Sequence, residues 1–300
     1  MTVGIAIQHQ PAHTPEHTKV YQTDNATLCR GNALEILPLI EPESIDALIT
    51  DPPYSSGATH KAGRTNQGSH AKYLNGENLH RFDGFAGENM DARSWAYWTQ
   101  LWMAQAHRAV RPGGYALVFT DWRQLPALTD AFQASGFTWR GIIAWNKGRG
   151  SRTPHTGYFR HQCEYIVWGS KGHLDKSPSG PFDGCMTYPV IPSKKMHPTG
   201  KPEELMAELV RTVNSGGTVL DPFMGSGTTG VAALKAGRKF IGIETSDHYF
   251  EVAAQRLRGL LPQPFRLHKT KPAFFAGLYI ITDVDSLWMF IRNKLIETIC

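Results

Sequence analysis

The sequence predicts an α/β fold with a doubly wound, mostly parallel sheet. Strand-forming and helix-forming stretches alternate along most of the chain, which is the pattern that βαβ units produce. Polar or glycine-rich turns follow directly after apolar strands at residues 50–54, 120–122 and 221–229. Ligands bind at the carboxyl ends of the strands in such a sheet, so we expect these turns to form a functional site.

The composition is that of a globular protein with enough apolar residues for a sizeable core. The chain has 300 residues, of which 41% are hydrophobic and 19% charged, and its formal net charge is +5. We expect one large domain or two smaller ones, and the positive charge permits a polyanionic partner. We expect no secretory leader and no membrane span, and hence a cytoplasmic protein. The four scattered cysteines indicate free thiols in a reducing compartment: Cys29, Cys163, Cys185 and Cys300.

The first predicted elements lie before the buried strand at residues 45–50. Residues 1–25 are polar and contain several His and Pro, so we expect a flexible arm before a domain at 26–260. A short strand is predicted over 26–29 and a short helix over 33–40, because leucines recur there at helical spacing.

The strand at 45–50 ends in a turn that carries chemistry. Two prolines stop the strand, because they cannot donate ladder hydrogen bonds, and they leave Asp51, Pro52, Pro53 and Tyr54 at its carboxyl end. This places a carboxylate, backbone carbonyls and an aromatic ring together. An ordinary turn with an exposed tyrosine is the plainer interpretation.

A long polar segment, residues 55–94, follows this turn. A loop of such length in a compact domain is typical of a lid or a binding loop, so we predict a mobile loop over the site. Its three histidines, at positions 60, 70 and 80, lack the spacing of metal ligands, and we expect no metal site. A helix is predicted over 94–110, with these residues facing the core: Trp95, Trp98, Leu101, Trp102 and Ala106.

Basic residues concentrate between residues 140 and 201, where ten Lys and Arg accompany three acids. Strands are predicted over 115–119, 137–145 and 164–168, and a helix over 130–135. The basic excess is typical of a phosphate-contacting surface, although a solvated basic face without a partner is also consistent with it. The candidate nucleic-acid contacts are Lys147, Arg149, Arg152, Arg160, Lys194 and Lys195.

A second chemical centre lies between residues 218 and 244. A strand at 218–220 leads into a glycine-rich turn and then a helix, an arrangement that offers close backbone approach and free N–H groups to an anion. The next strand ends in Glu244, a carboxylate suited to accept hydrogen bonds from ribose hydroxyls. The candidate cofactor-binding residues of the turn are Asp221, Pro222, Phe223, Gly225, Ser226, Gly227, Thr228 and Thr229.

Both centres resemble motifs of the amino-methyltransferases that use S-adenosylmethionine to methylate the exocyclic amine of adenine or cytosine in DNA. The family's catalytic tetrapeptide is Asp/Asn/Ser-Pro-Pro-Tyr/Phe/Trp, and its cofactor motif is Asp-Pro-Phe-x-Gly-Ser-Gly-Thr-Thr, which residues 221–229 match closely. The resemblance covers about residues 26–258. It implies a seven-stranded sheet of the class I methyltransferase type and S-adenosylmethionine as the cofactor.

The resemblance also implies roles for single residues. Asp51 and the Pro52 carbonyl would hold the hydrogens of the base amine, and Tyr54 would stack on a base flipped out of the duplex. Asn32 stands where the family often has an Asp near the adenine of the cofactor, and an ordinary helix N-cap is the alternative for it.

A third element of the resemblance precedes the glycine-rich turn. The stretch HPTGKP resembles the family's His-Pro-Thr-Gln-Lys-Pro cofactor element, with Gly200 in place of the Gln. It adds His197, Thr199 and Lys201 to the candidate cofactor-binding residues.

The order of the motifs resembles the circularly permuted class, because the catalytic tetrapeptide begins 170 residues before the cofactor motif, at 51 against 221. In that class target recognition usually lies between the last sheet strand and the cofactor motif, which implies residues 170–196 as the recognition segment. This segment is short, so either the loop after Tyr54 shares the task or the target sequence is short. Residues 261–300 fall outside the resemblance, and packing on the domain, a dimer contact and a non-native fusion are open explanations. The implied partner is double-stranded DNA, and the family also allows a homodimer and a cognate restriction endonuclease.

Three classes of function stay open. A DNA amino-methyltransferase leads, and the Asp form of the tetrapeptide favours adenine N6 over cytosine N4. A methyltransferase of the same fold that acts on RNA or on a protein amide is the second, for which Asn-Pro-Pro-Tyr is more typical. A nucleic-acid-binding module without catalysis is disfavoured because both motifs are intact.

Overall fold

The computed structural model describes residues 19–55, 90–150, 156–178, 180–189, 200–261 and 266–268. The predictions for the arm before residue 19, for most of the 55–94 loop and for most of the 261–300 extension lie outside these residues. So do Arg152, Lys194, Lys195, His197 and Thr199.

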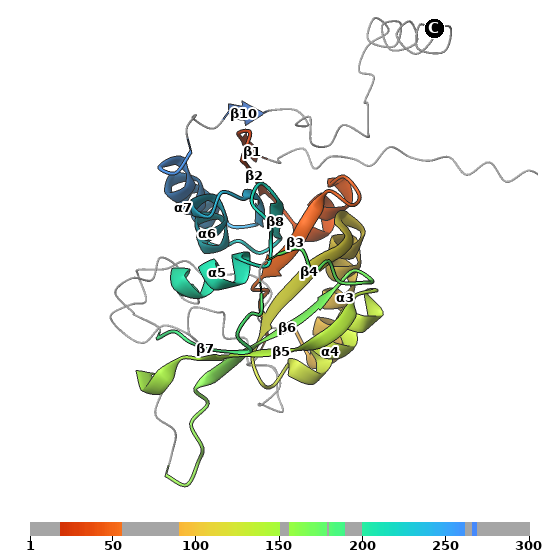
Figure 1. The fold of residues 1–300 in the computed structure, drawn as a ribbon, viewed down its shortest axis with the longest axis vertical. Helices are drawn as coiled ribbons and strands as arrows, with labels where there is room; N and C mark the ends of the chain where they lie inside the picture. Colours follow the sequence, from red (N-terminus) through yellow and green to blue (C-terminus); the bar gives the residue numbers. More distant parts are fainter. Residues whose placement is uncertain are drawn as a thin grey trace, which may run out of the picture.

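A single mixed sheet forms the centre of the fold (Figure 1), with strand order β10-β1-β2-β9-β8-β3-β4-β6-β5-β7. The ten strands among the described residues are three more than the seven predicted. The five from β2 to β4 are mutually parallel, whereas β6 is antiparallel to both of its neighbours and β1 is antiparallel to β2 and β10. The bounds are β1 Lys19–Gln22, β2 Ala26–Arg30, β3 Ile45–Thr50, β4 Val110–Thr120, β5 Thr138–Asn146, β6 Cys163–Ser170, β7 Cys185–Thr187, β8 Thr218–Asp221, β9 Lys239–Glu244 and β10 Arg266–His268.

Helices cover both faces of the sheet, as a doubly wound fold requires. One face carries α5 (Glu203–Val210), α6 (Thr228–Lys235) and α7 (Asp247–Arg258). The other carries α1 (Ala33–Ile36), the short η1 (Leu37–Leu39), α3 (Ala92–Ala109) and α4 (Leu125–Ala134). Among the described residues, no helix has the length and hydropathy needed to cross a membrane.

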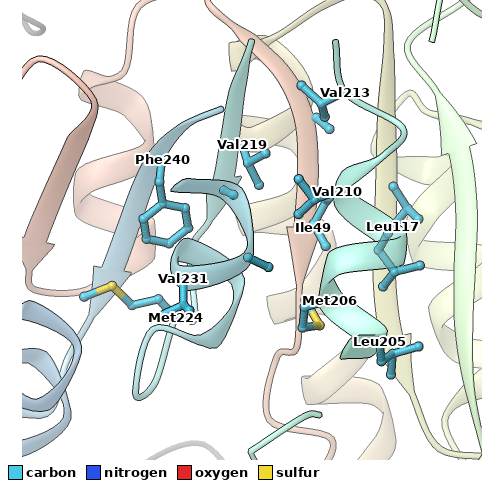
Figure 2. Close-up of a cluster of buried hydrophobic side chains, with 14 of the residues drawn as sticks. Ile49, Leu117, Leu205, Met206, Val210, Val213, Val219, Met224, Val231 and Phe240 are labelled. Atoms are coloured by element: carbon cyan, nitrogen blue, oxygen red, sulfur yellow. The ribbon is translucent and has the colours of Figure 1, made fainter. Parts of the chain in front are cut away.

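The central strands are buried on both faces, because side chains alternate between two hydrophobic clusters. On β3, Ile49 belongs to the cluster under α5 and α6, which Figure 2 shows, while Leu48 belongs to the cluster under α3. Leu117 and Val118 divide in the same way on β4. The sheet therefore holds its carboxyl edge rigidly.

Two predicted elements differ from the structure in detail. Helix α3 begins after the capping residue Asp91, whose carboxylate accepts two backbone N–H groups, and it buries Trp95 and Trp102 as predicted. Leu101, predicted to face the core, is 40% exposed. The predicted arm also contains a strand, because β1 starts at Lys19 and pairs with β2.

Candidate active site

The catalytic turn follows β3 at the carboxyl edge of the sheet. The Tyr54 hydroxyl donates a hydrogen bond to Asp51 Oδ1. Trp95 of helix α3 donates its Nε1–H to the Pro53 carbonyl at 2.7 Å. Since Trp95 is fully buried, this bond fixes the turn to the core of the domain.

Met90 also contacts this turn. The Met90 N–H donates to the Ser55 hydroxyl at 3.3 Å, immediately before helix α3 begins. Ser55 and Met90 are therefore held together beside the catalytic turn.

A chain of alternating charges leads to Asp51. Lys201 Nζ lies 2.6 Å from Asp51 Oδ2 and 3.3 Å from Glu164 Oε2, and Lys147 Nζ lies 2.9 Å from Glu164 Oε1. The Lys201 side chain is only 6% exposed. We call these four residues the charge chain.

Burial and charge act against each other within this group. Burial raises the pKa of Asp51 above its ordinary value, although the Lys201 ammonium works in the other direction. Burial alone would lower the pKa of Lys201 and raise that of Glu164. The opposite charges outweigh burial in both cases, so the pKa of Lys201 is raised and that of Glu164 is lowered. The charge chain therefore favours the Lys201 ammonium and an ionised Glu164.

The glycine-rich turn lies beside the catalytic turn, between β8 and α6. Gly225 and Gly227 have φ values of 51° and 78°, in the left-handed region that glycine adopts without strain. A side chain at Gly227 would also meet the Ala253 methyl group of α7 at 2.9 Å. Arg256 of α7 braces the same turn by donating to the Ser226 carbonyl at 2.6 Å and to the Thr228 hydroxyl at 3.1 Å.

Asp221 joins this turn to the catalytic strand. Its carboxylate accepts the Thr50 hydroxyl at 2.6 Å, the Thr229 hydroxyl at 2.6 Å and the Phe223 N–H at 3.1 Å. Burial raises the pKa of Asp221 to about 6, since the side chain is 2% exposed. All three donors belong to the protein, so Asp221 fixes the conformation of the glycine-rich turn through these hydrogen bonds.

Glu244 and Asn32 lie at the ends of β9 and β2. Glu244 accepts the Gly225 N–H at 3.0 Å and the Ser246 N–H at 2.8 Å, one on each carboxylate oxygen. The Asn32 side chain accepts the Leu34 N–H at 3.0 Å and caps helix α1. The helix N-cap, which was the alternative for Asn32, is thus present in the structure.

The structure brings together several predicted residues and adds others. Asp51, Tyr54 and Lys201 meet directly, but the observed contact of Lys201 is with Asp51 and not with the cofactor turn. Lys147, predicted as a nucleic-acid contact, forms an ion pair with Glu164. Glu164 was not predicted at all, because it stands at the start of a strand; only the antiparallel direction of β6 brings it to this edge.

The remaining predicted contacts lie around the β5–β6 connection. Arg149 is exposed on η3 (Gly148–Gly150), and Arg160 donates to its carbonyl at 3.4 Å. Next to Arg160, the side chains of Tyr158 and Phe159 are 72% and 93% exposed. No group of three metal-ligating side chains occurs within the part of the chain that the structure describes.

Comparison with known proteins identifies this arrangement. A family model described as DNA methylase, for the N6 and N4 methyltransferases, matches residues 45–180 and 175–255. The chain belongs to the N6/N4 DNA methylase family. Two type II methyltransferases are similar to it: M2.LlaDCHI of Lactococcus lactis subsp. cremoris, 27% identical over 260 residues (79% of this chain and 91% of that protein), and M2.DpnII of Streptococcus pneumoniae, 27% identical over 264 residues (80% and 92%). The crystal structure of M1.HpyAVI with S-adenosylmethionine (SAM) is 25% identical, with a TM-score of 0.55, and covers 77% of this chain and 98% of that one.

This DNA methylase is therefore an amino-methyltransferase that takes its methyl group from S-adenosylmethionine. The residues at the cofactor turn fit that molecule. The two Glu244 oxygens each accept one N–H and retain further acceptor positions for ribose hydroxyls. The first turn of α6 leaves backbone N–H groups without intrahelical partners, which suits a carboxylate.

Proposed function

We propose that this DNA methylase transfers the methyl group of S-adenosylmethionine to the N6 amine of adenine in double-stranded DNA. The observation that carries this proposal is the placement of Asp51 and Tyr54. Both lie at the carboxyl end of β3, and Asp221 links that strand to the cofactor turn through the Thr50 hydroxyl. Methyl donor and acceptor amine would then meet above neighbouring strands.

The chemistry explains why acceptors are needed there. The lone pair of an aromatic amine is delocalised into the ring, so the nitrogen must become pyramidal before it attacks a methyl group. Hydrogen-bond acceptors that hold both amine hydrogens favour that geometry. Asp51 supplies one acceptor, since each of its oxygens keeps a free acceptor position beside Tyr54 or Lys201. The Pro53 carbonyl is taken by Trp95, so we assign the second acceptor to Pro52.

Substrate access supports a flipped base. A base inside a duplex cannot reach a buried turn, so the target nucleotide must rotate out of the stack, and Tyr54 offers an aromatic face for it. Adenine is our choice over cytosine because the tetrapeptide begins with Asp51. The tetrapeptide's position before the cofactor motif supports the circularly permuted order, which we include in the proposal.

We assign the cofactor to the second turn. Bound S-adenosylmethionine supplies an electrophilic methyl group. The backbone of residues 225–229 would bind its carboxylate, Glu244 its ribose hydroxyls, and Asn32 would lie near its adenine. Phe223 packs against Trp98 and Trp102 at ring distances of 5.3 and 5.0 Å, so the turn is also supported from helix α3.

The β5–β6 connection is our candidate DNA surface. It combines basic residues, Arg149 and Arg160, with the exposed aromatic rings of Tyr158 and Phe159. Guanidinium groups neutralise phosphates and aromatic rings stack on bases, so this combination suits nucleic acid. The connection leaves the sheet next to Glu164 of the charge chain, so we place bound DNA over the catalytic turn.

One experiment tests the proposal directly. The protein is incubated with labelled S-adenosylmethionine and with duplex DNA, RNA or protein, and the DNA is digested to nucleosides for mass spectrometry. We expect N6-methyladenine from duplex DNA, and none from the D51A variant. D51A should still bind the cofactor in calorimetry, because Asp51 acts on the base amine.

Other outcomes of that experiment point to the alternatives. N4-methylcytosine would assign the site to cytosine, and label in RNA or protein would assign it to the second class of substrate. Duplex binding without any transfer would leave a binding module. A homodimer and a cognate restriction endonuclease stay predictions, which sedimentation and inspection of the neighbouring genes would test.

A further inference from the structure

The middle of the charge chain, Glu164 and Lys201, is buried and closely packed. Lys201 Nζ lies 5.2 to 5.8 Å from the ring centres of Tyr54, Phe119 and Trp145, as well as between two carboxylates. A buried ammonium is costly without a partner, and the aromatic walls leave it little room to move. Lys201 is therefore held within reach of both carboxylates.

This position gives Lys201 two opposing partners. If the ammonium were paired with Asp51 alone, it would compete with the base amine for the Asp51 carboxylate. Glu164 lies on the other side at 3.3 Å and attracts the same ammonium, while Lys147 at 2.9 Å keeps Glu164 in place. The carboxylate of Asp51 is thus stabilised without being fully neutralised.

We propose that Glu164 and Lys201 are positioning residues for methyl transfer. Lys201 keeps the Asp51 carboxylate ionised and aimed at the base amine, and Glu164 limits the hold of Lys201 on it. The proposal rests on the function proposed above, because it requires Asp51 to accept hydrogens from that amine. It gives Lys201 a role at the catalytic turn in place of cofactor binding.

The charged and titratable groups around Asp51 come from six segments of the described chain. Tyr54 lies in the same turn, Glu164 on β6, Lys147 after β5, Asp221 on β8, Asp121 after β4, and Lys201 before α5. Of these, the ammonium of Lys201 favours the charged form of Asp51, and the carboxylate of Glu164 opposes it. Removal of Lys201 must therefore raise the pKa of Asp51, and removal of Glu164 must lower it.

The pH dependence of kcat tests this prediction. Activity should fall on the acid side when Asp51 is protonated. K201M should move that acid limb to higher pH, and E164Q should move it to lower pH, each by about 1 to 3 pH units. In K201M kcat at neutral pH should fall about a hundredfold, the usual effect of a displaced catalytic group. Both variants should keep the wild-type dissociation constant for S-adenosylmethionine.

A control and a second readout make the result decisive. Lys171 forms a more exposed ion pair with Glu43, at 3.2 Å, away from the catalytic turn, and K171M should keep the wild-type pH profile. Titration of Asp51 by carboxyl 13C NMR of the free protein, assigned with D51N, needs no substrate. It should show the same opposite shifts, so it tests the charge chain even if the DNA activity differs from our proposal.

The outcomes separate the explanations. Opposite shifts in E164Q and K201M support the positioning role. Shifts in the same direction, or no shift in a folded variant, would overturn it. If K201M does not fold because Asp51 loses the Lys201 ammonium, E164Q is measured alone, and loss of the Glu164 charge should still move the acid limb to lower pH. A large loss of cofactor affinity in K201M would support the cofactor-binding role that the sequence predicts for Lys201.

Discussion

At the scale of single residues, Asp221 couples stability to pH. Its pKa is about 6 in the folded protein against an ordinary value of 3.8, because burial disfavours the charge. Between these values the folded state binds more protons than the unfolded state, so stability falls as pH rises through this window. The difference corresponds to about 3 kcal/mol.

D221N removes this ionisation and provides the test. Ionisation of Asp221 should lower the free energy of unfolding of the wild type as pH rises from 4 to about 7, which urea unfolding measures. The free energy of unfolding of D221N should depend less on pH over the same range. Asn keeps the size and one acceptor of the side chain, while the two threonine hydroxyls can rotate to accept. Equal slopes for both proteins would show that Asp221 is ionised normally in the folded state.

Single residues also mark the limit of prediction from the sequence. Asp51, Tyr54 and Glu244 could be chosen as candidates because each ends or follows a parallel strand, where ligands bind. Glu164 could not, since its position depends on the antiparallel pairing of β6. Lys147 was included in the predicted basic surface, because a count of charges cannot show that Lys147 pairs with Glu164.

At the scale of elements, helix α3 supports the catalytic turn through Trp95. W95F keeps an aromatic ring in the core but leaves the Pro53 carbonyl without its donor, which should cost about 1 to 3 kcal/mol of stability. We also expect a lower kcat with unchanged cofactor affinity. Chemical unfolding and steady-state kinetics measure both effects.

Trp102 on the same helix is the matched control. It is also fully buried, but its Nε1–H has no hydrogen-bond partner among the described residues. W102F therefore loses a similar volume and no hydrogen bond, so it should be more stable than W95F. If the two variants were equally stable, the bond to Pro53 would contribute nothing to the turn.

The basic residues of the β5–β6 connection predict that DNA affinity depends on salt concentration. R149A/R160A should weaken binding to target and scrambled duplexes alike, and should reduce the slope of log K against log salt by about two, at about 0.9 per lost phosphate contact. A loss confined to the target duplex would instead indicate base contacts. Lys239 and Arg258, which are exposed at the start of β9 and the end of α7, provide the control K239A/R258A at the opposite edge of the sheet.

The elements differed in how far the sequence predicts them. The strands at 45–50, 218–220 and 239–243 were recognisable as short apolar runs before polar turns, and they are β3, β8 and β9. Strands β1 and β7 lie toward the edges of the sheet and are short, so their alternation is too weak to detect. Helix α5 was missed because Pro202 and a glycine-containing stretch precede it.

At the scale of the whole molecule, the cofactor should stabilise the domain as a unit. The cofactor turn lies between the central strands β8 and β9, so its ligand is linked to global unfolding. Cofactor at a hundred times its dissociation constant should add about 2.7 kcal/mol. Thermal unfolding with and without S-adenosylmethionine measures this.

E244A shows whether the stabilisation comes from the assigned site. Loss of charge-assisted hydrogen bonds should weaken cofactor affinity by about 1.5 to 3 kcal/mol, so the same concentration should stabilise E244A much less. E41A, at an exposed position near the amino end of β3, should respond like the wild type. If S-adenosylmethionine stabilised the wild type, E244A and E41A equally, its ribose would not bind at Glu244.

The pairing of β5 with β6 has a consequence for how such an enzyme can diversify. Asn146 and Cys163 are register partners, and the Lys147 N–H donates to the Gln162 carbonyl at 2.8 Å. The two ends of the connection are therefore clamped together regardless of what joins them, and loop length costs little once its ends are fixed. Exchange of residues 148–161 for the equivalent stretch of a relative would leave Glu164 in place. Under the DNA contact proposed above, we expect such an exchange to change how the enzyme binds DNA while the charge chain stays intact.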